Sequence, residues 1–364
     1  MVLAGGGFRF GYYLGLHAAA IDAGQEPDLL LATCGGAVAG AIIAGLPDTA
    51  SRKAWLRSPQ MYEFLSGFKS SERARPVSAL WDIARRRLTS GDAVRVPDLF
   101  NDYLFEMPQP IPLPPSTPSS STLGSARDVA GRRPALAIIG GKLLFGPQEV
   151  GQPRLGRPIY DVILFCDDRT AALADGLPSA IGVDGWSDAV APVLQVDTAM
   201  PVADAARISI ADMVYFRCQT ARGADYTGGV IDLFPIELAR GLAHHVTMEM
   251  KEAYDELLAA PALRAAFGFD GNRRLRHVHA QPVDVWVDTS DVRGAMRGGG
   301  MQKRLDWRRN RIRLMPPVSY ARYLADVEAL WDFGYQRGQE AYSLAAQGSR
   351  PVMRNSSRHN KAQP

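Results

Sequence analysis

The chain has 364 residues, a formal net charge of +3 at pH 7 and an apolar fraction of 46%. A charge this close to balance gives no reason to expect a nucleic-acid partner, and no uninterrupted apolar run approaches the roughly 18 residues that a membrane-spanning helix requires. Cys34, Cys166 and Cys218 are widely spaced and odd in number, which favours a reducing compartment over a disulfide framework or a zinc site. With no secretory-signal pattern, the sequence predicts a cytoplasmic protein.

Two glycine-rich turns lie near the start of the chain. The first, residues 5–9, follows the apolar run 2–4 and leads into a helical stretch, so its backbone N–H groups can face a developing negative charge. The second, residues 32–36, follows the apolar run 29–32 and opens a small-residue helix at 37–43, with Cys34 at the tip. This strand–turn–helix pattern is typical of a nucleophile turn, and the alternation of strands and helices predicts crossovers in a mostly parallel sheet.

Further along the chain the organisation is uneven. Residues 50–102 mix aromatic side chains with a basic stretch at 85–87 and are expected to be helical. Residues 108–134 are rich in proline and serine and predict a flexible insertion, with a polyproline docking segment as the alternative. The fold resumes with predicted buried strands at 135–139 and 160–165.

A third glycine block, at 226–235, completes a pattern with the two N-terminal turns. Together the three blocks resemble the patatin-like phospholipase family, which combines a GGGx(R/K)G oxyanion loop, a GxSxG nucleophile turn and a DG(G/A) motif that supplies the aspartate of a Ser-Asp dyad. The resemblance places Cys34 on the nucleophile and Thr227 on the dyad aspartate. It places the oxyanion loop and the motif glycines on Gly5, Gly6, Gly7, Arg9, Gly35, Gly36, Gly228 and Gly229.

The resemblance covers roughly residues 2–249 and implies a patatin-like, three-layer α/β fold. That fold has a mostly parallel central sheet, helices on both faces and, in this chain, a C-terminal helical extension. The expected domains are a patatin-like α/β domain at 1–258, interrupted by the insertion at 108–134, then the extension at 259–346 and a disordered tail at 347–364. The implied activity is that of a lipid acyl hydrolase or acyltransferase that acts on an acyl ester or thioester, with no cofactor and no metal.

Four residues depart from the family pattern: Phe10, Ala32, Cys34 and Thr227. A serine without a base is a poor nucleophile. A cysteine at a helix N-terminus near Arg9 is expected instead to have a lowered pKa, so an acyl-Cys34 intermediate needs no dyad. The alternative is that catalysis was lost, which leaves a catalytically inactive protein with a lipid-binding or regulatory role.

Other polar residues are candidates for the missing base or for a ligand site. Asp225, two residues before Thr227, is a candidate substitute carboxylate, and His244 and His245 are weaker candidates on a predicted helix at 236–258. His277 and His279 alternate as if on a strand, but without a third ligand they do not predict a metal site.

The C-terminal part contributes a basic segment and a final helix. The segment at 293–313 is expected to be a solvated, partly paired basic face, with peripheral contact to an anionic membrane as the alternative. The final helix places one apolar stripe toward the core, with a lipid-contacting face as the weaker interpretation; its members are Tyr320, Tyr323, Leu324, Val327, Leu330, Trp331 and Gly334. A dinucleotide-binding loop at Gly5 and Gly7 is rejected, because Phe10 occupies the third glycine position and no acidic residue ends the second strand.

Overall fold

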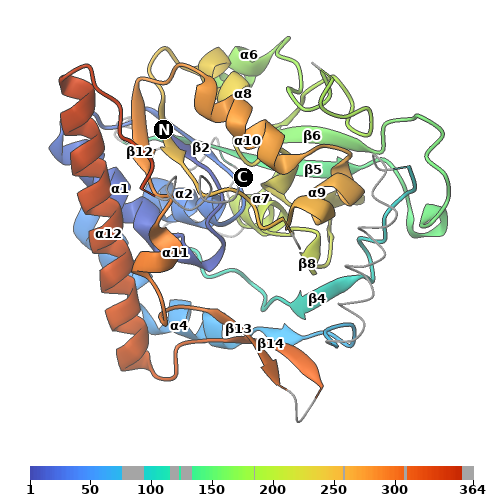
Figure 1. Ribbon diagram of the computed structural model, residues 1–364, viewed down its shortest axis with the longest axis horizontal. Coiled ribbons are helices and arrows are strands. Elements are labelled where there is room, and N and C mark those ends of the chain that lie inside the picture. Colours follow the sequence, from blue (N-terminus) through green and yellow to red (C-terminus); the bar gives the residue numbers. More distant parts are fainter. Residues whose placement is uncertain are drawn as a thin grey trace, which may run out of the picture.

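A mixed sheet lies at the centre of the computed structural model, which describes residues 1–75, 94–114, 123, 133–183, 185–256, 259–306 and 310–354. Within these ranges the sheet has seven strands (Figure 1), namely β1 (Val2–Leu3), β2 (Leu29–Ala32), β5 (Ala135–Leu143), β6 (Tyr160–Phe165), β7 (Gln195–Asp197), β9 (Gln219–Ala221) and β10 (Ala224–Thr227). The pairs β1–β2, β2–β5 and β6–β7 are parallel, whereas β5 also pairs antiparallel with β6 and β10. Because β1 and β2 run parallel, the two N-terminal glycine turns leave the sheet at the same edge.

Helices cover both faces of this sheet, and the side-chain alternation of the strands shows it. Leu30, Ala32 and Ile138 belong to one core, which includes residues of α1 (Gly11–Asp22), α2 (Gly35–Gly45), α7 (Val202–Ser209) and α12 (Tyr320–Ala346). Leu31 and Ile139 belong to a second core with α8 (Ile236–Leu242), α9 (Ala259–Phe267) and α10 (Gly271–Ala280). Successive strand residues point to opposite faces, so the α/β fold with helices on both faces is confirmed.

The long helix α12 lies along α1 (Figure 1). A methyl group on Gly15 would overlap the Trp331 carbonyl oxygen, and one on Gly334 would overlap the Tyr12 carbonyl oxygen. The two backbones therefore approach each other across paired glycines. Tyr323, Val327, Leu330, Trp331 and Gly334 are buried, so most of the stripe predicted on this helix faces the core. Leu324 is half-buried, and Tyr320, at the first turn, is exposed.

The remaining elements surround this body. They are η1 (Gly7–Arg9), α3 (Thr49–Leu56), α4 (Pro59–Ser66), β3 (Lys69–Ser70), β4 (Tyr103–Glu106), η2 (Pro147–Glu149), α6 (Asp168–Ala174), β8 (Val214–Phe216), η3 (Gly229–Asp232), β11 (Thr247–Met250), β12 (Val285–Asp288), α11 (Val292–Ala295), β13 (Gln302–Asp306) and β14 (Arg311–Met315). β3, β4 and β8 form a small sheet, β11 pairs parallel with β12, and β13 and β14 form a hairpin that lies near α4 in Figure 1. None of the described helices combines the length and apolar character needed to cross a membrane.

Two sequence predictions are wrong at the level of elements. The helix expected at 236–258 ends at Leu242, because the chain then joins β11, where Thr247 lies opposite Val285 and the Val246 amide donates to Asp284 (2.8 Å). His277 and His279 lie on α10 rather than on a strand. The predicted helical stretch at 50–102 and the insertion at 108–134 lie partly outside the described residues, as does most of the predicted tail at 347–364. The domain boundaries remain a prediction.

Candidate active site

Cys34 lies at a strained turn between β2 and α2. Its backbone has φ 49° and ψ −126°, a conformation that residues with a side chain rarely adopt. Its amide donates to Ser209 Oγ (2.8 Å), and Ser209 Oγ in turn donates to the Ile139 carbonyl (2.7 Å), which ties the turn to α7 and β5. Strain held by surrounding contacts at a strand–helix corner is the usual geometry of a nucleophile turn.

The three glycine blocks meet around this residue. A methyl group on Gly5 would lie 3.3 Å from Cys34 Cβ, and one on Gly229 would lie 3.2 Å from the Cys34 amide nitrogen. A methyl group on Gly35 would overlap the carbonyl oxygen of Gly7. Gly5 N also donates to Thr33 Oγ1 (3.0 Å), so the first turn is hydrogen-bonded to the second. Gly35, Gly36 and Gly229 therefore lie where backbone meets backbone, and larger residues there would push the segments apart.

The carboxylate that contacts Cys34 is Asp212, which the sequence analysis did not single out. Cys34 Sγ lies 2.9 Å from Asp212 Oδ2, within hydrogen-bond distance for sulfur. Asp212 follows the end of α7, and burial raises its pKa to about 7 although the Cys34 hydrogen bond opposes this rise. The sequence did offer one indication of this role: Asp212 follows a helix and lies shortly before the third glycine block, although it falls outside the family motif.

The two carboxylate positions proposed from the sequence lie elsewhere. Thr227 is buried and its hydroxyl donates to the Ala211 carbonyl (3.3 Å), while the Gly228 amide donates to the same oxygen (2.8 Å). These two bonds hold the backbone that carries Asp212. Asp225 instead accepts from Thr220 Oγ1 (2.5 Å) across β9 and β10. The contacts recorded for Asp225 among the described residues lie on the sheet and do not include Cys34, so Asp225 as substitute base stays a prediction.

The state of the Cys34 thiol also differs from expectation. Burial, followed by the charge of Asp212, raises the pKa of Cys34 well above its usual range, whereas the Gly35 amide and Lys251 lower it. Only 7% of Cys34 is exposed, so desolvation outweighs the helix N-terminus. The charge of Arg9 interacts with Arg293, Tyr12 and Glu252. The pKa of Cys34 is therefore shifted in the direction opposite to the lowering expected beside Arg9, and Cys34 Sγ donates to Asp212 in this geometry.

Two aromatic residues near the first glycine turn, Phe8 and Phe10, pack in different places. Phe10 is 4% exposed and belongs to the first core, where the ring packs in place of the family glycine. Phe8 is half-buried, and its ring meets those of Phe68 (centroids 4.8 Å apart) and Phe216 (6.2 Å). An apolar cluster therefore begins directly beside Gly7.

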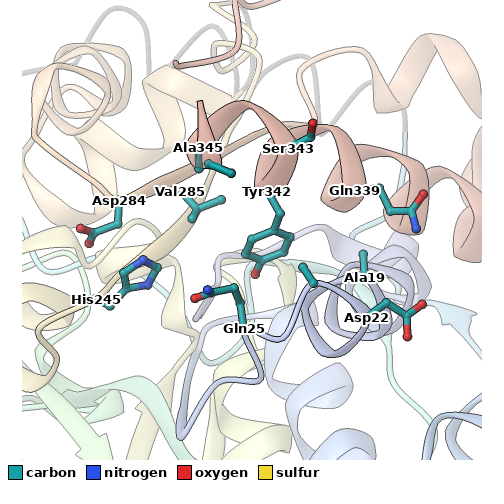
Figure 2. A pocket seen from close by; sticks show the side chains of 12 residues that line it. Ala19, Asp22, Gln25, His245, Asp284, Val285, Gln339, Tyr342, Ser343 and Ala345 are labelled. Atoms are coloured by element: carbon teal, nitrogen blue, oxygen red, sulfur yellow. The ribbon is translucent and has the colours of Figure 1, made fainter. Parts of the chain in front are cut away.

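None of the contacts recorded for the four histidine candidates within the described residues involves Cys34. His277 Nε2 lies 3.1 Å from Glu237 Oε1, and the ring of His279 packs on Trp286. His244 and His245 follow the end of α8 and are exposed. His245 lines a cavity of about 640 Å³ between the C-terminal ends of α1 and α12 (Figure 2). The residues lining this cavity include none from the three glycine blocks, so we do not associate it with Cys34.

The basic segment at 293–313 includes the β13–β14 hairpin, and several of its cations have partners within the protein. Arg313 pairs with Asp306 (3.6 Å), Lys303 Nζ donates to the Tyr215 hydroxyl (2.8 Å), and Arg311 donates to the carbonyls of Ser70 and Ser71. These contacts agree with a partly paired basic face. Contact with an anionic membrane remains a prediction.

Comparison with known proteins gives little further guidance. No family model and no curated protein matches the chain. Among solved structures the chain is similar to VipD from Legionella pneumophila, with 13% sequence identity and a TM-score of 0.29 over 63% of this chain and 45% of VipD. The matched region thus spans less than half of that protein. A similarity this low does not support any statement about activity. The activity has to be argued from the geometry around Cys34.

Proposed function

We propose that this protein is a patatin-like lipid acyl hydrolase or acyltransferase that acts on an acyl ester or thioester through an acyl-Cys34 intermediate, with Asp212 as the general base. The observation that carries the proposal is the 2.9 Å contact between Cys34 Sγ and Asp212 Oδ2 at the tip of a strained strand–turn–helix unit. A nucleophile and a base within hydrogen-bond distance are the minimum requirement for acyl transfer. A base with a pKa of about 7 is well matched to neutral pH.

The reaction follows from these two groups. As Cys34 Sγ attacks the acyl carbon, its proton passes to Asp212, and the carbonyl oxygen becomes an oxyanion. Asp212 then returns the proton to the leaving alkoxide or thiolate, which departs as an alcohol or thiol. Water or another acceptor hydroxyl, deprotonated by Asp212, attacks the thioester and releases a fatty acid or a new ester, which restores the thiol.

The first glycine turn supports the oxyanion in this scheme. Gly5 N is already bonded to Thr33, but among the described residues the amides of Gly6 and Gly7 donate to no protein acceptor. Gly7 lies against Gly35, next to the nucleophile. Backbone N–H groups fixed near the reacting carbon are the usual donors to such an oxyanion. The aromatic cluster beginning at Phe8 favours an apolar acyl group.

The alternative is a catalytically inactive protein with a lipid-binding or regulatory role. Its support is the burial of Cys34, which is 7% exposed and has a strongly raised pKa. A buried, protonated cysteine is often only a small core residue.

Acylation by an activated ester distinguishes the two functions. We expect p-nitrophenyl butyrate to release nitrophenol and to leave a butyryl group on the peptide that contains Cys34, detected by mass spectrometry after acid quench. Cys34→Ala should abolish both signals, with Cys166→Ala as the matched control that leaves them intact. If the wild-type protein binds lipid vesicles but neither releases nitrophenol nor acquires the acyl group, the inactive lipid-binding role replaces the proposal.

A further inference from the structure

A half-buried lysine holds the oxyanion loop from behind. Lys251 follows the end of β11, and its side chain is 17% exposed. Its ammonium donates to the carbonyl of Ala4 (3.0 Å) and, at closer range, to the carbonyl of Gly5. Ala4 is the first residue after strand β1, and Gly5 is the first glycine of the loop; they lie 247 and 246 residues from Lys251 in the sequence. The sequence analysis gave no reason to select Lys251.

The contact with Gly5 fixes a peptide group rather than one atom. The Gly5 carbonyl and the Gly6 amide belong to the same planar trans peptide, in which C=O and N–H point in opposite directions. Lys251 holds the oxygen end, and the Tyr13 hydroxyl lies 2.7 Å from the same oxygen. Thr33 holds the neighbouring Gly5 amide. The direction of the Gly6 N–H is therefore determined by contacts on its far side.

A carboxylate in turn holds the ammonium in place. Glu249 is fully buried, and Glu249 Oε1 lies 2.9 Å from Lys251 Nζ. Glu249 also accepts from the hydroxyls of Tyr12 (2.8 Å), Tyr13 and Thr289 (2.7 Å). A buried ion pair is tolerated when its remaining hydrogen-bonding capacity is satisfied, as it is here. The network keeps one positive charge at a fixed position behind residues 5–7, three glycines that have no side chains of their own.

The charge has a second effect on the same peptide. A cation bonded to a carbonyl oxygen draws electron density from the peptide and strengthens the N–H at its other end as a donor, since linked hydrogen bonds polarise one another. In a poorly solvated site this effect is larger than in water. The Gly6 amide is thus both aimed and polarised from the Lys251 side.

We propose that Lys251 is a positioning residue for the oxyanion loop, which orients and polarises the Gly5–Gly6 peptide so that the Gly6 N–H stabilises the oxyanion formed at Cys34. The inference rests on the proposed acyl-Cys34 chemistry. It assigns to Lys251 a step that Asp212 does not perform, because Asp212 moves the proton and Lys251 supports the loop that receives the negative charge.

The test compares acylation of Cys34 with its alkylation, because alkylation by iodoacetamide forms no oxyanion. In Lys251→Met we expect the acylation rate at saturating p-nitrophenyl butyrate to fall about 10- to 100-fold, somewhat less than for loss of a direct oxyanion donor. The half-saturating ester concentration should change less than threefold. The alkylation rate should also fall, because the charge of Lys251 lowers the pKa of Cys34, but it should fall at least threefold less than the acylation rate. If acylation and alkylation fall by the same factor, Lys251 acts on the thiol alone, and the inference is overturned. It is also overturned if neither rate falls.

The matched control is Lys53→Met. Lys53 also pairs with a carboxylate, that of Glu328, and lies over an aromatic ring, that of Trp331. The Lys53→Met variant should therefore acylate and alkylate at the wild-type rates. Thermal unfolding of each variant shows whether it folds. If Lys251→Met does not fold, Lys251→Gln replaces it, because glutamine keeps a hydrogen-bond donor but carries no charge.

Hydrogen exchange separates this inference from the proposed function. In Lys251→Met the amides of residues 5–9 should exchange faster than in the wild type and in Lys53→Met, whether or not the protein is acylated. If the wild type is not acylated, the proposed function fails. If exchange in residues 5–9 is unchanged, the positioning role fails on its own evidence.

Discussion

Asp212→Asn tests the central pair of the site, because asparagine keeps the shape of the side chain and an acceptor oxygen but cannot take a proton. At pH 8 we expect acylation of Cys34 to fall by about 10²- to 10⁴-fold, the usual contribution of a general base. In the wild type the acylation rate should rise with pH through about 7, where Asp212 ionises. In the variant this inflection should disappear. An unchanged rate and an unchanged pH profile would show that Asp212 is not the base.

The same variant makes a prediction about stability. Burial raises the pKa of Asp212 from 3.8 to about 7 in the folded protein. The carboxyl group is therefore protonated in the folded state over a range where it is ionised in the unfolded chain, and the wild type loses stability as pH rises from about 4 to about 7. A rise of this size corresponds to about 4 kcal/mol at most.

Asp212→Asn has no such penalty. Its free energy of unfolding should match that of the wild type near pH 4 and exceed it by up to about 4 kcal/mol at pH 8. Urea unfolding followed by circular dichroism at several pH values measures the difference. A difference that stays constant from pH 4 to pH 8 would refute the reasoning, because it would mean that the folded protein does not change the pKa of this group.

Three further predictions follow from the same geometry. Cys34→Ser places a hydroxyl beside Asp212 and should retain measurable hydrolysis of p-nitrophenyl butyrate, whereas Cys34→Ala should have none; equal rates for the two would contradict the pair. Thr227→Asp buries a carboxylate where a hydroxyl now donates to Ala211, so it should lower the free energy of unfolding by about 3 kcal/mol or more. Thr227→Val, which removes only the hydrogen bond, should lower it by about 1 kcal/mol. Equal losses in urea unfolding would show that the position tolerates charge. Gly334→Ala should separate α12 from α1 and lower the free energy of unfolding by about 1–3 kcal/mol. Gly294 has open space around it, so Gly294→Ala should change the free energy of unfolding by no more than about 0.5 kcal/mol. A similar shift in melting temperature for both variants would show that the helices do not need the close contact.

The α/β fold and the geometry of Cys34 follow from local signals in the sequence. An apolar run followed by glycines and small residues leaves few alternatives to a strand, a tight turn and a helix, so both N-terminal turns were predictable. Alternating apolar residues placed 135–139 and 160–165 in the sheet, and the stripe on 320–334 assigned the buried face of α12. In each case the information lies within one element, where steric limits and side-chain periodicity act over a few residues.

The partner of Cys34 and its protonation depended on the tertiary structure. Asp212, Thr227 and Asp225 are all polar residues near the third glycine block, and nothing local distinguishes the one that faces Cys34. The choice follows from how α7 packs against α2 on one side and β10 on the other, which turns Asp212 inward and leaves Asp225 on the sheet surface. Burial then sets the pKa values, because desolvation depends on every atom around the group. Sequence alone therefore determined where the strand–turn–helix unit that carries Cys34 would lie, and the packing of distant segments decided that its sulfur lies beside Asp212, with Lys251 behind the neighbouring loop.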